Sequence, residues 1–114
     1  MIFVVEDEDR WVAMVGCLAD EEDCSVATLW GMWVEPGARG RGVGERLVAT
    51  IVEWTRQRGA VARLELGVRP ANRSAVSLYE RAGFMVSGAP RAVAGDDSVL
   101  ETPMTLSLAQ TPRP

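Results

Sequence analysis

Three glycines at alternate positions divide the chain into two parts that must fold differently. Gly40, Gly42 and Gly44 follow a series of strand-like segments and open a helix-like segment at residues 43–58. Glycine permits positive φ angles and lets a ligand approach the backbone without meeting a Cβ atom. A helix that begins there offers unbonded N–H groups and the positive end of its dipole. The loop therefore predicts either a tight strand-to-helix turn or a cradle for a phosphate-bearing ligand.

The part before the glycines predicts an antiparallel meander. Apolar segments at residues 2–5, 11–19 and 24–34 are joined by short acidic connectors, and such connectors suit antiparallel neighbours. This disfavours a dinucleotide-binding site, which needs a parallel βαβ unit. In the third segment, we expect Leu29 and Trp33 on one face. The side chains expected on the other face are Val26, Thr28, Trp30, Met32 and Val34.

The part after the glycines alternates between helical and strand patterns. Gly59 and Gly83 are suited to end two helices, and Asn72 is suited to begin the second. The predicted elements are a helix at 43–58, a strand at 61–68, a helix at 73–82, a strand at 84–86, a loop at 87–98 and a strand at 99–108. The order βββ-α-β-α-β-β predicts an α+β fold, in which helices pack on a mixed, mostly antiparallel sheet.

Composition excludes several kinds of chemistry. Among the 114 residues there is no histidine, and all twelve basic residues are arginine. This removes imidazole-based nucleophile systems, Schiff-base lysines and histidine-ligated zinc. Cys17 and Cys24 cannot complete a metal site, so no metal is expected, and we interpret them as free thiols in a reducing cytoplasm. No secretory signal or membrane-spanning run is visible, so we expect a cytoplasmic protein without a membrane partner.

Charge is distributed unevenly along the chain. Net charge is −4, and the acidic residues dominate the first third while arginines dominate the rest. An overall negative chain is not expected to bind nucleic acid. Local arginines accompany the glycine loop and a second site, at Arg39, Arg41, Arg46, Arg69 and Arg73. They suit a small anionic ligand, although each could equally be a solvated surface side chain.

A second motif lies in the segment from Asn72 to Phe84. Asn72 and Tyr79 are seven residues apart, which places them about 20° apart on one helical face. Ala75 lies between them and leaves room for a ligand on that face. The alternative interpretation is a helix-capping asparagine and a core tyrosine.

Together, the two motifs resemble the GNAT superfamily of acetyl-CoA-dependent N-acetyltransferases. The segment from Arg39 to Gly44 is similar to the family's R-x-x-G-x-G motif. The segment from Asn72 to Phe84 is similar to its N-x-x-A-x-x-x-Y-x-x-x-G-F stretch. The resemblance covers about residues 2 to 108, so we expect one domain over residues 1–108 and a tail at 109–114.

The resemblance implies a role for each matching position. The amides of the glycine loop would hold the coenzyme A pyrophosphate. The backbone of the preceding strand would pair with the pantetheine arm, and the amide of Val34 would stabilise the oxyanion. Asn72 would contact the pantetheine, and Tyr79 would protonate the departing thiolate. The expected acetyl-CoA-binding residues are Met32, Trp33, Val34, Arg39, Gly40, Arg41, Gly42, Val43, Gly44, Asn72, Arg73 and Tyr79.

The implied reaction is direct attack of a neutral primary amine, on a small molecule or a protein, without a covalent enzyme intermediate. Glu65 is our candidate for the base that deprotonates the amine, and the alternative is a plain surface acid. A second hypothesis is a non-catalytic acyl-CoA-binding or regulatory module, because no base is evident from the pattern.

The sequence departs from the family pattern at its beginning. Family domains usually carry a strand and two helices before the meander, and these are expected to be absent here. A sheet without them would leave an edge or an apolar face exposed, which favours association. A homodimer is therefore an expected partner arrangement, beside acetyl-CoA and an amine acceptor.

Overall fold

The first part of the chain forms the predicted meander. The structure, a computed structural model, describes residues 1–93 and 95–108. Strands β1 (Ile2–Asp7), β2 (Arg10–Ala19) and β3 (Val26–Val34) pair in antiparallel fashion. The tight turn between β1 and β2 places two residues at positive φ, Glu8 and Asp9. Such residues match the twist of a two-residue hairpin turn.

The glycine region connects this meander to the remaining elements. A short 3-10 helix, η1 (Pro36–Ala38), is followed by α1 (Val43–Arg58), β4 (Arg63–Val68) and α2 (Arg73–Arg81). Strands β5 (Met85–Val86), β6 (Arg91–Val93) and β7 (Asp96–Ser107) complete the order. As predicted, Gly59 caps α1 in the left-handed conformation and Asn72 caps the start of α2.

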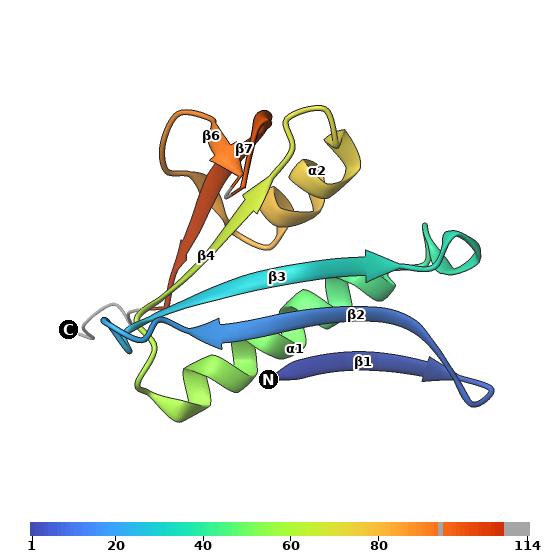
Figure 1. Cartoon of the computed structure of the whole chain (residues 1–114). Coiled ribbons are helices and arrows are strands. Elements are labelled where there is room, and N and C mark those ends of the chain that lie inside the picture. The colour runs from blue at the N-terminus through green and yellow to red at the C-terminus, as the bar shows by residue number, and fades with distance from the viewer. Residues whose placement is uncertain (94, 109–114) are drawn as a thin grey trace.

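The sheet divides between β3 and β4. Its strand order is β1-β2-β3-β4-β7-β5, with β6 paired to β7. Parallel pairing of β3 with β4 runs only from Val26–Arg63 to Thr28–Glu65, whereas β4 and β7 stay paired from Arg63 to Val68. Figure 1 shows the result: β3 and β4 start together and diverge. We call the opening between them beyond Thr28 the fork.

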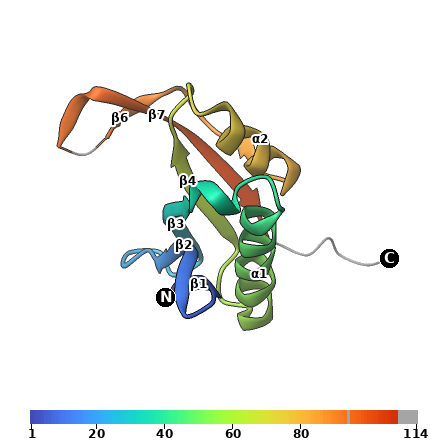
Figure 2. The same ribbon diagram turned by 90° about the vertical axis from the view of Figure 1, so that its right-hand side faces the viewer.

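Both helices pack on the same face of the sheet (Figure 2). We call this the helix face and the opposite one the open face. The core lies between helices and strands, and its fully buried side chains include Val15, Val48, Ile51, Leu64 and Met104. Burial of apolar area of this kind is the main force that holds the layers together. The predicted α+β fold and its mostly antiparallel sheet are confirmed.

The predicted faces of the third strand are wrong in part. Gly31 has φ +64, and the β2–β3 register shifts between Met14 and Gly16. This bulge reverses the alternation, because an extra residue on one strand moves every later side chain to the other face. Before it, Leu29 is in the core and Trp30 is exposed; after it, the half-buried Met32 packs against the core.

The predicted loop at 87–98 is also wrong. Strand β6 lies within it, and β7 begins at Asp96 rather than at residue 99. The two strands form a hairpin in which Arg91 opposes Glu101 and Ala92 opposes Leu100. The small and polar residues of this segment concealed its strands, since pairing with β7 rather than intrinsic preference determines their conformation.

The remaining sequence-level expectations concern sulfur and membranes. Cys17 is buried and Cys24 is exposed, and both are free thiols. Burial raises the pKa of the Cys17 thiol. In the described part of the chain, no helix combines the length and the apolar character needed to cross a bilayer.

Candidate functional site

The glycine loop has the backbone that a ligand cradle requires. Gly40 and Gly42 have φ of 81° and 75°, a left-handed region that other residues adopt only with strain. A Cβ atom built on either residue would meet no atom within 4 Å, so the loop faces open space. Gly42 is the N-cap of α1, and its carbonyl accepts from the Arg46 amide at 3.0 Å. The N–H groups of the first turn of α1 are therefore directed toward this space.

Gly44 has a different role, because it lies where α1, α2 and β3 meet. A Cβ at this position would be 3.3 Å from Leu78, 3.4 Å from Met32 and 3.6 Å from Val34. The absence of a side chain lets the first turn of α1 approach the end of β3 closely. This packing fixes the glycine loop beside the fork, at the C-terminal end of β3.

Strand β3 offers a backbone amide to the fork. The N–H of Glu35 donates to the Val12 carbonyl at 2.7 Å, which bonds this residue to β2. In an antiparallel pair, successive residues direct their backbone groups to opposite sides. The N–H of Val34 therefore points away from β2 and into the fork, whereas that of Trp33 points toward β2. The Val34 carbonyl accepts from Nε of Arg39 at 2.9 Å, so this arginine links the loop to the strand.

Helix α2 supplies Asn72 and Tyr79, and both have structural partners. Oδ1 of Asn72 accepts from the Ala75 amide at 3.3 Å, which leaves its NH2 group for another acceptor. Tyr79 is buried and packs edge-to-face on Phe84, with ring centroids 5.9 Å apart. Burial raises the pKa of the Tyr79 phenol, so it stays protonated at neutral pH and keeps a proton to donate.

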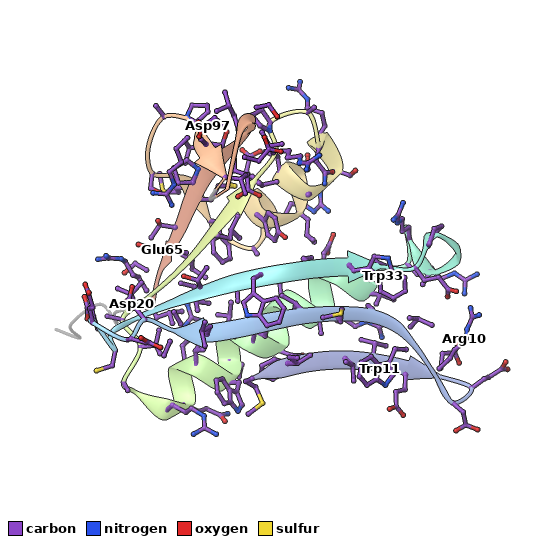
Figure 3. The ribbon with its side chains drawn as sticks, viewed as in Figure 1. Arg10, Trp11, Asp20, Trp33, Glu65 and Asp97 are labelled. Carbon is purple, nitrogen blue, oxygen red and sulfur yellow. The ribbon has the colours of Figure 1, made fainter. Side chains whose placement is uncertain are left out.

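Glu65 lies on the other side of the sheet from Tyr79. Its neighbours Leu64 and Leu66 are buried in the helix-side core, so alternation along β4 directs Glu65 to the open face. Figure 3 shows it close to the point where β3 and β4 separate. Oε1 accepts from Nε of Arg63 at 3.0 Å, and the carboxylate is half-buried. A base at this position would act from the open face, while Tyr79 would act from the helix face.

The structure brings together only part of the predicted set. Met32 and Val34 meet Gly44, and Arg39 meets Val34. Val43 is buried beneath the loop in the core. The side chains of Arg41, Arg73 and Trp33 are exposed, and Trp33 lies on the open face opposite Met14.

Three contributors were missed by sequence reasoning. Leu78 contacts the Gly44 position, and Arg81 of α2 donates to Glu45 of α1 from Nε at 3.0 Å and from Nη2 at 2.7 Å. Neither contact has a local sequence signal, because the partners are more than 30 residues apart. Gly16 on the open face was missed as well, although a glycine inside an apolar strand can signal close approach. Trp30 lies directly over it.

Metal ligation has no candidate within residues 1–93 and 95–108. No group of three or more aspartate, glutamate, cysteine or histidine side chains there could hold an ion. The acidic side chains instead make local bonds. The serine two residues onward lowers the pKa of both Asp23 and Asp96 through hydrogen bonds from its hydroxyl and its amide.

Comparison with known proteins gives relatives that share this architecture. The chain is 34% identical over 86 residues to the uncharacterized N-acetyltransferase MJ1207 of Methanocaldococcus jannaschii, covering 72% of the chain and 38% of that protein. It is 32% identical over 84 residues to a mycothiol acetyltransferase of Beutenbergia cavernae, covering 74% of the chain and 28% of that protein. The chain thus spans well under half the length of these two relatives.

Two solved structures share the fold. A GNAT-family acetyltransferase from Streptococcus pneumoniae superposes with a TM-score of 0.84 at 22% identity, over 95% of this chain and 66% of that one. The ribosomal-protein-S18-alanine N-acetyltransferase of Escherichia coli superposes with a TM-score of 0.80 at 23% identity, over 98% and 71%.

The match that decides membership is a family model. The model described as the acetyltransferase (GNAT) family matches residues 1–84, which contain the meander, the glycine loop and both helices. The chain belongs to the GNAT family of acetyltransferases.

Proposed function

We propose that the chain binds acetyl-CoA and transfers its acetyl group to a primary amine of a small molecule or a protein. One observation carries the proposal: the left-handed, open glycines at the start of α1 lie next to a fork into which the Val34 amide points. A pyrophosphate at the helix N-terminus and an extended arm in the fork would satisfy both features at once.

The residues present suit acetyl-CoA as cosubstrate. Gly40 and Gly42 leave space for phosphate oxygens near the N–H groups of α1, and Arg41 adds positive charge at that position. We assign the remaining expected residues to acetyl-CoA binding through their amides or side chains, although the Trp33 side chain lies on the open face and Val43 is buried in the core. The remaining residues are Met32, Trp33, Val34, Arg39, Val43, Gly44, Asn72, Arg73 and Tyr79.

The proposed reaction needs three groups of this chain. Acetyl-CoA supplies an acetyl group on a thioester. The Val34 amide donates to the carbonyl oxygen as negative charge develops there. Glu65, directly or through water, takes a proton from the acceptor amine. A nitrogen–carbon bond forms as the carbon–sulfur bond breaks, and Tyr79 gives its proton to the departing sulfur.

The acceptor is proposed in broad terms. The names of the relatives point to different acceptors, since one refers to mycothiol and another to an alanine of ribosomal protein S18, so acceptor class differs within the family. For this chain, we further propose a cytoplasmic location, no nucleic-acid or membrane partner, and association as a homodimer through its exposed sheet. The free state of Cys17 and Cys24 supports the location.

Thiol release across a panel of primary amines tests the proposal. Tyr79→Phe removes one hydroxyl and keeps the aromatic packing on Phe84. We expect kcat to fall about 100-fold, because loss of a general acid costs this much, while the calorimetric affinity for acetyl-CoA stays within about twofold.

The controls separate the alternatives. Equal melting temperatures show that the variant is folded. Unchanged kcat in Tyr79→Phe would remove this residue as the acid. If the protein binds acetyl-CoA but no amine in the panel causes release of the coenzyme A thiol, the chain is a non-catalytic acyl-CoA-binding module and the proposal is wrong.

A further inference from the structure

A depression lies on the open face beside the fork. Its volume is about 450 Å³, which is within the range of small-molecule sites. It is built by β4, β6, β7 and the segment that leads from β5 to β6. Its lining includes Arg63, Glu65, Ser87, Arg91 and Thr105. In Figure 2 the β6–β7 hairpin extends to the side away from the helices.

Glu65 connects this depression to the fork. It is the last residue of β4 that pairs with β3, so it marks the base of the fork. Across β4 and β7 it opposes Thr105, whose hydroxyl donates to Ser87 at 2.9 Å on the adjoining wall. An acceptor in the depression would therefore extend its amine past Glu65 toward the fork.

Two arginines and one carboxylate line the depression, and only one of the arginines is paired with the carboxylate. Arg63 is paired with Glu65 through Nε at 3.0 Å. Arg91, on β6, makes no ion pair within 4.0 Å with another described side chain. Its register partner Glu101 lies instead against Gly67, where a Cβ would be 2.7 Å from Oε1. Arg91 is thus the cation left available to a ligand.

The separation of the two ends can be gauged from the strands. Glu65 opposes Thr105 and Arg91 opposes Glu101, so the two positions are four residues apart along β7. At about 3.3 Å per residue, this is an offset of roughly 13 Å along the direction of β7. The side chains shorten the gap because both border one depression.

We infer that the acceptor is an amine that also carries an anionic group, with the amine at Glu65 and the anion at Arg91. The inference rests on the proposed acetyl transfer and narrows its acceptor. A guanidinium binds carboxylates through paired hydrogen bonds and stays charged at all relevant pH values. The hydroxyls of Ser87 and Thr105 lie between the two ends and can bond to polar groups of the connecting chain.

Matched acceptors with and without an anionic group test the inference. Glycine, β-alanine, 4-aminobutyrate and 6-aminohexanoate are each compared with the corresponding amide. We expect kcat/KM to be at least about tenfold higher for the carboxylate at the favoured length, which corresponds to about 1.4 kcal/mol. Arg91→Gln should abolish this preference and leave the KM for acetyl-CoA unchanged. Arg56→Gln, an exposed arginine at the far end of α1, should keep it.

The outcomes are distinguishable from failure of the proposed function. Transfer to acids and amides with equal kcat/KM, or a preference that survives in Arg91→Gln, would overturn the inference and leave acetyl transfer standing. Absence of thiol release with every amine would overturn the proposed function and, with it, this choice of acceptor. If Arg56→Gln also loses the preference for carboxylate acceptors, that preference results from the net charge of the protein and not from the depression, and the inference is overturned.

Discussion

The two faces of the sheet differ in what fixes their residues. On the helix face, Leu64 and Val48 are fully buried, and glycines at positive φ shape the loop beside them. On the open face, apolar and aromatic side chains remain exposed, among them Trp11, Leu18, Trp30 and Trp33 (Figure 3 labels two of the tryptophans). The proposed cosubstrate side therefore depends on backbone geometry and packing, whereas the proposed acceptor side depends on individual side chains.

The largest expected effect separates the faces by stability. Leu64→Ala leaves a cavity in the core, and we expect it to lower the free energy of unfolding by about 2–5 kcal/mol. Leu18→Ala is the matched change on the open face, because the Leu18 side chain is 63% exposed whereas that of Leu64 is 0% exposed. It should change the free energy of unfolding by no more than about 0.5 kcal/mol. Urea unfolding measures both. Equal losses would mean that the open face is packed in solution.

The next effect tests the backbone requirement of the glycine loop. Gly42→Ala places a side chain at φ +75, which costs about 1–2 kcal/mol, and it should weaken acetyl-CoA binding in calorimetry. Gly37→Ala is the control, because Gly37 has no positive φ and a Cβ there would meet nothing within 4 Å. Gly42→Asn should lower the free energy of unfolding less than Gly42→Ala does, since asparagine tolerates this conformation. A neutral Gly42→Ala would contradict the cradle geometry.

The smallest effect tests side-chain contact on the open face. A Cβ at Gly16 would lie 2.1 Å from Cε2 of Trp30, so Gly16→Ala must displace the ring, at an expected cost of about 1 kcal/mol. In a Trp30→Ala background the same change should stabilise by about 0.5 kcal/mol, because alanine suits a strand better than glycine. A double-mutant cycle measures the reversal. Additive effects would show that the ring does not rest on Gly16.

The sequence predicted what local chemistry determines. Asn72 and Gly59 define helix ends because capping is a property of a few neighbouring residues. The glycine loop was evident for the same reason, since positive φ restricts the residue type. These features also belong to the helix face, so the proposed cosubstrate side was the predictable one.

The features that were missed depend on contacts distant in sequence. The bulge at Gly31 results from pairing with β2, and β6 exists because β7 lies beside it. Glu65 could be named as an acid on a strand, but its Arg63 partner, its depression and its position at the base of the fork are tertiary facts. Arg91 gave no signal at all in a segment that predicted a loop.

Amide hydrogen exchange with and without acetyl-CoA tests the central claim most directly. In the free protein, the Val34 amide should exchange faster than that of Trp33, because it points into the fork and not toward β2. Saturating acetyl-CoA should slow exchange at Val34 and at residues 39–44, and leave the distant β2–β3 turn at residues 20–25 unchanged. Unchanged exchange at Val34 and in the loop under saturating acetyl-CoA would contradict the account.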